Sequence, residues 1–229
     1  MSAHSSDALV IQLDPTYGPG QLVPALERAG LQMHLVQPHR GDQVPTDLRR
    51  MEGLVVLGGA LHAHDDSRVP HLRAVRALLR TARGRNLPTL GIGLGAQLLA
   101  LALEGRIGPA RARDAGKLLR LTELTLTDAG RADPLLSALA EHPVGMDIAG
   151  DGVRSLPPAS TLLATDARGG VQAFRTEEVL WGLQFHPEAD EALVRAAVGS
   201  TACLPAADDP VRAAWTALLD AFADQVRTG

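Results

Sequence analysis

The sequence predicts an α/β fold of three layers, with a mostly parallel central sheet between helices and a small antiparallel strand region in the C-terminal half. Through the first hundred residues, short apolar segments alternate with stretches of helical periodicity, as in βαβ units that build a parallel sheet. The apolar segment at 51–57 is nearly continuous, which is typical of a strand covered on both faces. Beyond Gly105, short strand-like segments follow one another between Gly, Pro and Asp turns, which indicates antiparallel pairing.

The expected elements alternate along the chain. The clearest helix covers 69–85, where apolar residues recur every three or four positions with arginines between them. A shorter helix is expected at 133–139, because Asp133 is a favourable cap and Pro134 suits the first helical position. The other expected helices are 21–29, 97–103, 191–198 and 211–227. The expected strands are 8–13, 31–36, 51–57, 89–92, 118–127, 143–148, 161–165, 171–175 and 179–184.

Length and composition restrict the class of protein. The chain has 229 residues, which suits a single domain over 1–229 with a substantial core. The net charge of -4 argues against a nucleic-acid partner. No apolar run approaches the length of a membrane span and the N-terminus lacks the features of a signal peptide, so we expect a cytoplasmic protein with no membrane partner. The single cysteine, Cys203, excludes an intrachain disulfide and a cysteine-rich metal site.

The stretch PTLGIGLGAQLLALALEG at 88–105 contains the most informative pattern in the chain. A short apolar strand runs into a glycine-rich turn and then into an apolar helix. In such an elbow the apex residue has a positive φ, and its side chain stands at the top of the sheet above a helix N-terminus. Here the apex is Gly93, which avoids roughly 1–3 kcal/mol of backbone strain and offers no side chain for chemistry.

Three segments in order resemble the class I glutamine amidotransferases. GIGLGAQ (91–97) resembles the family's nucleophile motif Gly-x-Cys-x-Gly-x-Gln, with Gly93 in the place of the cysteine. LVVLGGALHAHDD (54–66) is similar to the oxyanion-strand loop, and WGLQFHPEAD (181–190) resembles the His-Pro-Glu motif. The resemblance implies the flavodoxin-like fold of this family, in its stand-alone, GMP-synthase-like type.

The resemblance also implies the roles of individual residues. In the family a cysteine thiolate attacks the side-chain amide of glutamine, a histidine shuttles the proton and a glutamate orients the histidine, while backbone N–H groups hold the oxyanion. By position, His186 is the base and Glu188 its orienter, whereas Gly93 supplies nothing that can attack. The positions implied for the oxyanion and substrate site are Gly58, Gly59, Leu94 and Gln97.

Two weaker segments also depart from the family. Stand-alone members carry a Glu-Ile-Gly-Trp-like segment and a His-Gly-Asp segment near the glutamine, and the matching stretches here are DAGK (114–117) and AGD (149–151). Lys117 thus stands in the place of the aromatic residue and Ala149 in the place of the histidine. A single engineered change at Gly93 would leave these positions intact, so the several departures favour a natural loss of the nucleophile.

Two classes of function follow. The first is a binding, regulatory or partner subunit that keeps the cleft, with glutamine or a γ-glutamyl-like molecule as ligand and a synthase or paralogous amidotransferase as partner; a homo-oligomer is a further option. The alternative is a glutamine amidotransferase or glutaminase, either inactivated by the substitution at Gly93 or using another attacker such as water activated by His186. In the first class, His186 and Glu188 keep a binding role or remain only as a packed, hydrogen-bonded pair. Cys203 is a poor replacement nucleophile, because a helix separates it from the His-Pro-Glu turn.

Histidines and carboxylates gather between residues 62 and 71. Such side chains are ligands of zinc and iron, but alternate residues of an extended loop do not converge by spacing alone, so we expect a solvated loop and no metal site. The glycines of the elbow resemble a phosphate loop only superficially, since the lysine and hydroxyl of that motif are missing. No cofactor is therefore expected. The histidines and carboxylates between residues 62 and 71 are His62, His64, Asp65, Asp66 and His71.

Overall fold

The computed structural model describes residues 7–109, 119–148, 150–201 and 203–229. Within these residues, a nine-stranded sheet has the order β2-β1-β3-β4-β11-β10-β9-β6-β7. Neighbouring strands are parallel from β2 to β11 and antiparallel from β11 to β7, so the predicted α/β fold with its added antiparallel region is confirmed. The strands are β1 (Asp7–Ile11), β2 (Gln32–Val36), β3 (Gly53–Val56), β4 (Thr89–Ile92), β6 (Leu119–Leu126), β7 (Val144–Ile148), β9 (Ser160–Asp166), β10 (Val171–Thr176) and β11 (Leu180–Leu183).

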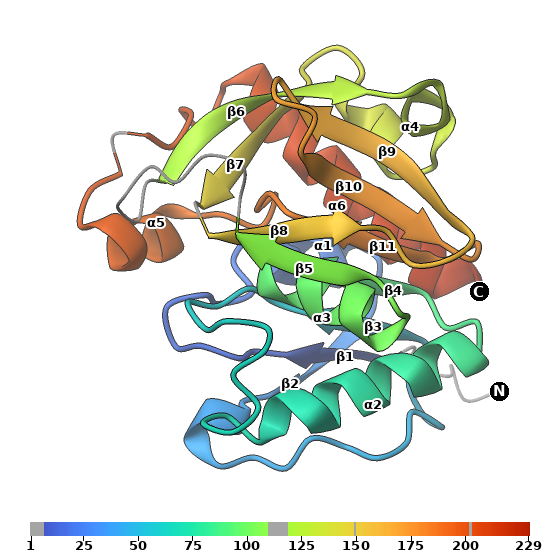
Figure 1. Cartoon of the computed structure of the whole chain (residues 1–229). Helices are drawn as coiled ribbons and strands as arrows, with labels where there is room; N and C mark the ends of the chain where they lie inside the picture. The colour runs from blue at the N-terminus through green and yellow to red at the C-terminus, as the bar shows by residue number, and fades with distance from the viewer. Residues whose placement is uncertain (1–6, 110–118, 149, 202) are drawn as a thin grey trace, which may run out of the picture.

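Helices cover both faces of the sheet (Figure 1). Alternation along β1 explains the two layers: Ala8 and Val10 pack in the core with α1 and α6, whereas Leu9 and Ile11 pack in the core with α2 and α3. Each face therefore receives every second side chain of the strand. The α-helices are α1 (Leu22–Arg28), α2 (His71–Gly84), α3 (Leu94–Ala102), α4 (Asp128–Ala132), α5 (Glu191–Val198) and α6 (Pro210–Thr228), and the two 3-10 helices are η1 (Pro38–Arg40) and η2 (Leu136–Leu139).

A separate two-stranded sheet, formed by β5 (Arg106–Pro109) and β8 (Asp151–Ser155), lies beside α3 (Figure 1). No sequence pattern predicted these two strands. Both are short, and β8 has only one buried residue, so neither carries an apolar alternation that could be recognised. The pair matters for function because β8 contributes to the cavity described below.

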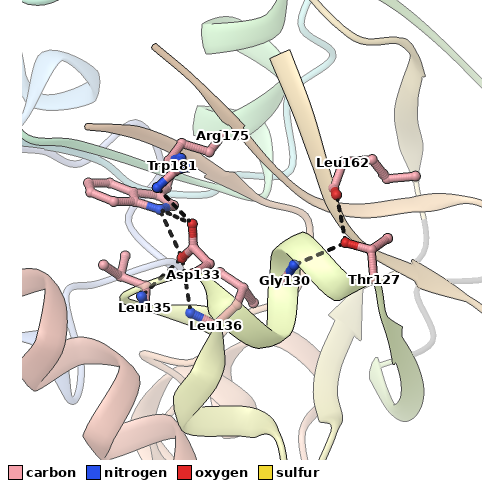
Figure 2. A network of polar contacts seen from close by, with 8 residues as sticks. All are labelled: Thr127, Gly130, Asp133, Leu135, Leu136, Leu162, Arg175 and Trp181. Carbon is pink, nitrogen blue, oxygen red and sulfur yellow. Dashed lines mark hydrogen bonds and ion pairs between the residues drawn. The ribbon is translucent and has the colours of Figure 1, made fainter. Parts of the chain in front are cut away.

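The predicted helix at 133–139 is shorter and of another type, a 3-10 helix, although Asp133 makes the capping hydrogen bonds expected of it. An α-helix ends one residue before Asp133, which has an extended backbone, and only a 3-10 helix follows at Leu136–Leu139. The missed helix α4 begins after Thr127, whose Oγ1 accepts a hydrogen bond from the N–H of Gly130 at 3.0 Å (Figure 2). Thr127 is thus the N-cap of α4.

Asp133 also joins a buried polar network (Figure 2). Its side chain is 0% exposed, and its Oδ1 accepts hydrogen bonds from the N–H groups of Leu135 at 2.9 Å and Leu136 at 3.2 Å. The carboxylate also accepts from Nε1 of Trp181 at 3.2 Å and pairs with Nη1 of Arg175 at 3.3 Å. Since Trp181 lies in β11, the network anchors the strand that leads to the His-Pro-Glu segment.

Candidate functional site

The elbow has the predicted geometry. β4 ends at Ile92, and Gly93 adopts φ 54° and ψ -113° before α3 begins at Leu94, three residues earlier than expected. The N–H of Gly93 donates to the carbonyl of Leu183 in the adjacent β11 at 2.7 Å. The carbonyl of Gly93 accepts from the N–H of Gln97 at 3.1 Å. The apex is therefore fixed from both sides by backbone hydrogen bonds.

His186 and Glu188 form a buried pair just beyond β11. Nδ1 of His186 lies 2.8 Å from Oε1 of Glu188, and the two residues are 3% and 0% exposed. The other carboxylate oxygen of Glu188 has no hydrogen-bond partner within the described part of the chain. The N–H of His186 donates to the carbonyl of Met146 at 2.8 Å, which ties the segment to β7. The two side chains are thus in contact, and their roles as base and orienter stay a prediction.

Tyr17 is a neighbour of this pair that no sequence signal indicated. It comes from the β1–α1 loop and is 3% exposed, and its ring centroid lies 5.7 Å from that of His186. Burial raises the pKa of the Tyr17 hydroxyl above its usual value, with further contributions from the negative charges of Asp14 and Glu188. Only the position of this loop after the first strand could have suggested a role.

The ring of His186 lies where the side chain of an apex residue would begin. A β-carbon built on Gly93 would be 2.8 Å from Nε2 and 2.9 Å from Cε1 of His186. A β-carbon built on Gly58 would be 2.6 Å from the same Cε1. The imidazole therefore packs between the backbones of two glycines, and neither position has room for a larger residue without movement of the ring.

The two segments predicted to bind the oxyanion lie together. A β-carbon on Gly59 would be 3.2 Å from Cδ2 of Leu94 and 3.2 Å from Cβ of Asp14. The N–H of the next residue, Ala60, donates to Oδ2 of Asp14 at 3.2 Å, which holds the loop in place. The N–H of Leu94 belongs to the first turn of α3, where no intrahelical acceptor exists. Their role as oxyanion donors remains a prediction.

Two glutamines connect the elbow to β8. Nε2 of Gln97, the residue predicted to sit near the substrate, donates to the carbonyl of Asp151 at 2.8 Å. Gln184, which was not predicted, donates from Nε2 to the carbonyl of Gly93 at 3.2 Å and accepts at Oε1 from the N–H of Val153 at 3.0 Å. Gln184 thereby joins the apex to β8, and both side chains line the same cavity.

A cavity of about 320 Å³ lies over the elbow. The elbow and its neighbouring loops contribute Tyr17, Gly59, Gly93, Leu94 and His186 to its lining. The antiparallel half of the sheet contributes a second set of residues, which we call the charged wall: Arg120, Asp147, Asp166, Arg168 and Gln172.

Asp147 is the most perturbed carboxyl of this wall. Its side chain is 16% exposed, and burial raises the pKa of this carboxyl above its usual value. Nη2 of Arg120 at 3.4 Å and the nearby His186 act in the opposite direction, while the negative charge of Asp166 adds to the increase. The wall therefore carries a carboxylate that its surroundings do not fully neutralise.

The histidines and carboxylates at 62–71 separate into unrelated contacts. Nδ1 of His62 lies 3.0 Å from Oδ2 of Asp151 in β8. Asp66 accepts two hydrogen bonds of 2.7 Å from Nη2 of Arg76, which lowers the pKa of that carboxyl, and His64 is exposed. Within the described ranges, no three His, Cys, Asp or Glu side chains are close enough to hold a metal ion.

The other predicted positions lie away from the elbow or cannot be placed. The DAGK segment (114–117) and Ala149 fall outside the described residues. Cys203 is half-buried, packs against the core and is not part of the cavity lining. Among the described residues, no helix has the length and apolar character needed to cross a membrane.

Comparison with known proteins identifies the family. The model of the family "Glutamine amidotransferase class-I" matches residues 20–197. The chain therefore belongs to the class I glutamine amidotransferases. The matched range includes the positions predicted for the nucleophile, the base and the oxyanion site.

Individual relatives agree with this assignment. The chain is 33% identical over 148 residues to a glutamine-hydrolyzing GMP synthase of Porphyromonas gingivalis, a match that covers 64% of this chain but only 27% of the relative. It is 29% identical over 165 residues to one subunit of the glutamine-hydrolyzing GMP synthase of Natronomonas pharaonis, covering 72% of this chain and 78% of that one.

Solved structures share the fold at lower identity. A glutamine amidotransferase of Thermotoga maritima matches with a TM-score of 0.79 at 19% identity, over 99% of this chain and all of that one (100%). A glutamine amidotransferase of Methylobacillus flagellatus matches with a TM-score of 0.74 at 22% identity, over 97% of this chain and 93% of that one. At such identities the likeness supports the fold alone.

Proposed function

We propose that this chain, as one domain over residues 1–229, is a binding, regulatory or partner subunit that does not hydrolyse glutamine by the thiol mechanism of its family. The observation that carries the proposal is the contact between His186 and Gly93. Cleaving an unactivated amide requires a strong nucleophile beside the base, and here the base packs directly against a backbone that bears no side chain. Cys203, the only thiol, does not line the cavity.

The preserved parts of the site support a retained ligand. His186, which is paired with the buried Glu188, still lines one cavity together with the loop at Gly59, the first turn of α3 at Leu94 and the side chain of Gln97. Its volume of about 320 Å³ lies at the lower end of the range for small-molecule sites. Glutamine or a γ-glutamyl-like molecule is the ligand that this arrangement favours.

The relatives also support a partner. The similarity to one subunit of a glutamine-hydrolyzing GMP synthase favours a separate synthase chain as the partner of this protein. A paralogous amidotransferase and a second copy of this chain are the alternatives. These three assemblies are distinguished by purification of the tagged chain from its own host. The mass of the native complex is then measured and its components are identified.

A second candidate function is hydrolysis with another attacker. Glu188 is fully buried with one oxygen unpartnered among the described residues, and such a group is costly to keep. Its retention favours a working base at His186, which could take a proton from water as that water attacks an acyl carbon, and return the proton to the amine or alcohol that leaves when its bond to the acyl carbon breaks. The acyl group would have to be more reactive than an amide, because water is a much weaker nucleophile than a thiolate.

The test of the proposal is ammonia release from L-glutamine by the parent chain and by Gly93→Ala and Gly93→Cys variants. The alanine variant is the matched control, since it adds the same β-carbon without a thiol. We expect no release by the parent or by Gly93→Ala. Release by the parent that disappears in a folded His186→Ala variant would show that the chain is an active glutaminase by another route.

The cysteine variant then reports on the cavity. If Gly93→Cys releases ammonia, His186 can move aside and the remaining site is intact. If the variant is folded and silent, the site has been rebuilt for binding. Hydrolysis of γ-glutamyl p-nitroanilide by the parent, with the His186→Ala variant as control, tests the second candidate function.

A further inference from the structure

We propose that the cavity binds its small-molecule ligand through a protonated amine held by Asp147 and Asp166 of the charged wall, and that it needs no carboxylate on the ligand. The inference rests on the proposed function, in which the cavity is a binding site. It goes further by assigning the charge that the site selects.

The first support is the negative charge of the two partly buried carboxylates of the charged wall. Asp147 extends from β7 and Asp166 ends β9, and neither is more than partly exposed. Arg120 lies 3.4 Å from Asp147, and among the described residues of the wall the only other cation, Arg168, is exposed. The negative charge of Asp166 works against ionisation of Asp147, so the two carboxylates repel each other. A cation placed between them would remove this repulsion.

Asp166 is held in position by its own turn. Its Oδ1 accepts hydrogen bonds from the N–H groups of Arg168 and Gly170, each at 2.8 Å. No ion pair involving Asp166 occurs within the described part of the chain. The carboxylate is therefore oriented before any ligand arrives, and its charge is not consumed by the protein.

The second and independent support is Gln172. This residue lines the cavity and is only 6% exposed, yet its Oε1 has no hydrogen-bond partner among the described residues. A buried amide oxygen without a donor is unfavourable, and a ligand N–H is the group that would satisfy it. An ammonium carries three N–H donors and no acceptor, which matches two carboxylates and one amide oxygen.

The same groups disfavour an anionic ligand on this wall. A carboxylate bound there would stand beside Asp147 and Asp166 and would add to their repulsion. Arg120 is already engaged with Asp147, and the exposed Arg154 and Arg168 are screened by water and salt. Recognition should therefore depend on the amine of a ligand and tolerate loss of its carboxylate.

Calorimetric titration of the full chain with three related probes tests this assignment. L-Glutamine carries an amine and a carboxylate, 4-aminobutanamide lacks the carboxylate, and glutaramate lacks the amine. We expect 4-aminobutanamide to bind and glutaramate to bind at least about tenfold more weakly, because a charge-assisted hydrogen bond is lost. Equal or tighter binding of glutaramate, or no binding of 4-aminobutanamide, overturns the inference without bearing on ammonia release.

Variants locate the interaction. Asp147→Asn and Asp166→Asn should each weaken 4-aminobutanamide binding by about tenfold. Asparagine at 166 keeps an Oδ1 acceptor for the turn, so folding is preserved. Asp208→Asn, at an exposed aspartate outside the cavity lining, is the matched control and should bind as the parent does. If both folded wall variants also bind as the parent does, the amine does not contact these carboxylates.

Discussion

Nε2 of His186 lies 2.8 Å from the place where a β-carbon of residue 93 would stand. The ring is held there by its 2.8 Å contact with Glu188 and by the neighbouring ring of Tyr17. Two features therefore require a glycine at the apex: the φ of 54° and the position of the imidazole. The missing nucleophile and the placement of the base form one structural feature, since a thiol at this apex needs a different position of the ring.

Replacement of Gly93 by alanine should lower the free energy of unfolding by more than the roughly 1–3 kcal/mol of the backbone strain alone. The added carbon both occupies a positive φ and crowds His186. Urea denaturation of the parent and the variant measures the difference.

Gly30→Ala is the control for the positive φ alone. Gly30 has a φ of 74°, and nothing lies within 4 Å of the position that its β-carbon would take, so the variant meets the backbone strain without a clash. If Gly93→Ala loses no more stability than Gly30→Ala, the ring of His186 moves freely and the crowding argument is wrong.

Local patterns in the sequence were sufficient to predict the elbow. The strand at 89–92 and the positive φ of Gly93 follow from apolar and glycine spacing that acts within a few residues. Tyr17 and the two strands of the small sheet could not be predicted in this way. Their importance comes from contacts with residues far away along the chain, such as His186, which leave no periodicity in the local sequence.

The region around Asp133 shows a different limit. The carboxylate of Asp133 accepts from the N–H groups of Leu135 and Leu136, two and three residues further on, as the side chain of an N-cap does. The same carboxylate also accepts from Trp181 and pairs with Arg175, both distant in sequence. The local pattern therefore predicted the capping bonds, whereas the 3-10 type of the helix and the tertiary partners left no local signal.

Asp133→Ala should cost about 3 kcal/mol or more of unfolding free energy, because it leaves the indole N–H of Trp181 and the guanidinium of Arg175 without their carboxylate. Asp133→Asn should cost less, since its remaining oxygen can still accept from the turn. Thermal and urea unfolding of the three proteins measure both effects. Equal losses for the two variants would mean that the charge, and not the hydrogen bonds of the turn, dominates.

The hydroxyl of Tyr17 should titrate above the usual tyrosine pKa of 10.0, because burial and the nearby charges of Asp14 and Glu188 disfavour the phenolate. Tyr17 is the only tyrosine in the chain, so absorbance at the phenolate band reports it alone. In the Glu188→Gln variant one negative charge is gone, and the pKa should fall toward the usual value. A midpoint at or below 10.0 in the folded parent would contradict the burial of this hydroxyl.

Asp147→Asn should make the protein more stable at pH 7 while weakening the amine binding proposed above. Burial raises the pKa of Asp147 above the usual 3.8, so the folded chain binds a proton at this carboxyl more tightly than the unfolded chain does. Stability of the parent therefore falls as the pH rises from 3.8 through the raised pKa, and the whole penalty is present above that window. Asparagine does not titrate and avoids the penalty, and Arg120, which is 42% exposed, stays hydrated when this contact is lost.

The difference in unfolding free energy between the Asp147→Asn variant and the parent isolates this group from the other carboxylates that titrate at low pH. It should be positive at pH 7 and should shrink as the pH approaches 3.8. A variant that is less stable at pH 7 would mean that the contact with Arg120 outweighs the burial of the carboxylate. A gain in stability together with a loss of binding is the behaviour of a residue kept for a ligand at the expense of the fold.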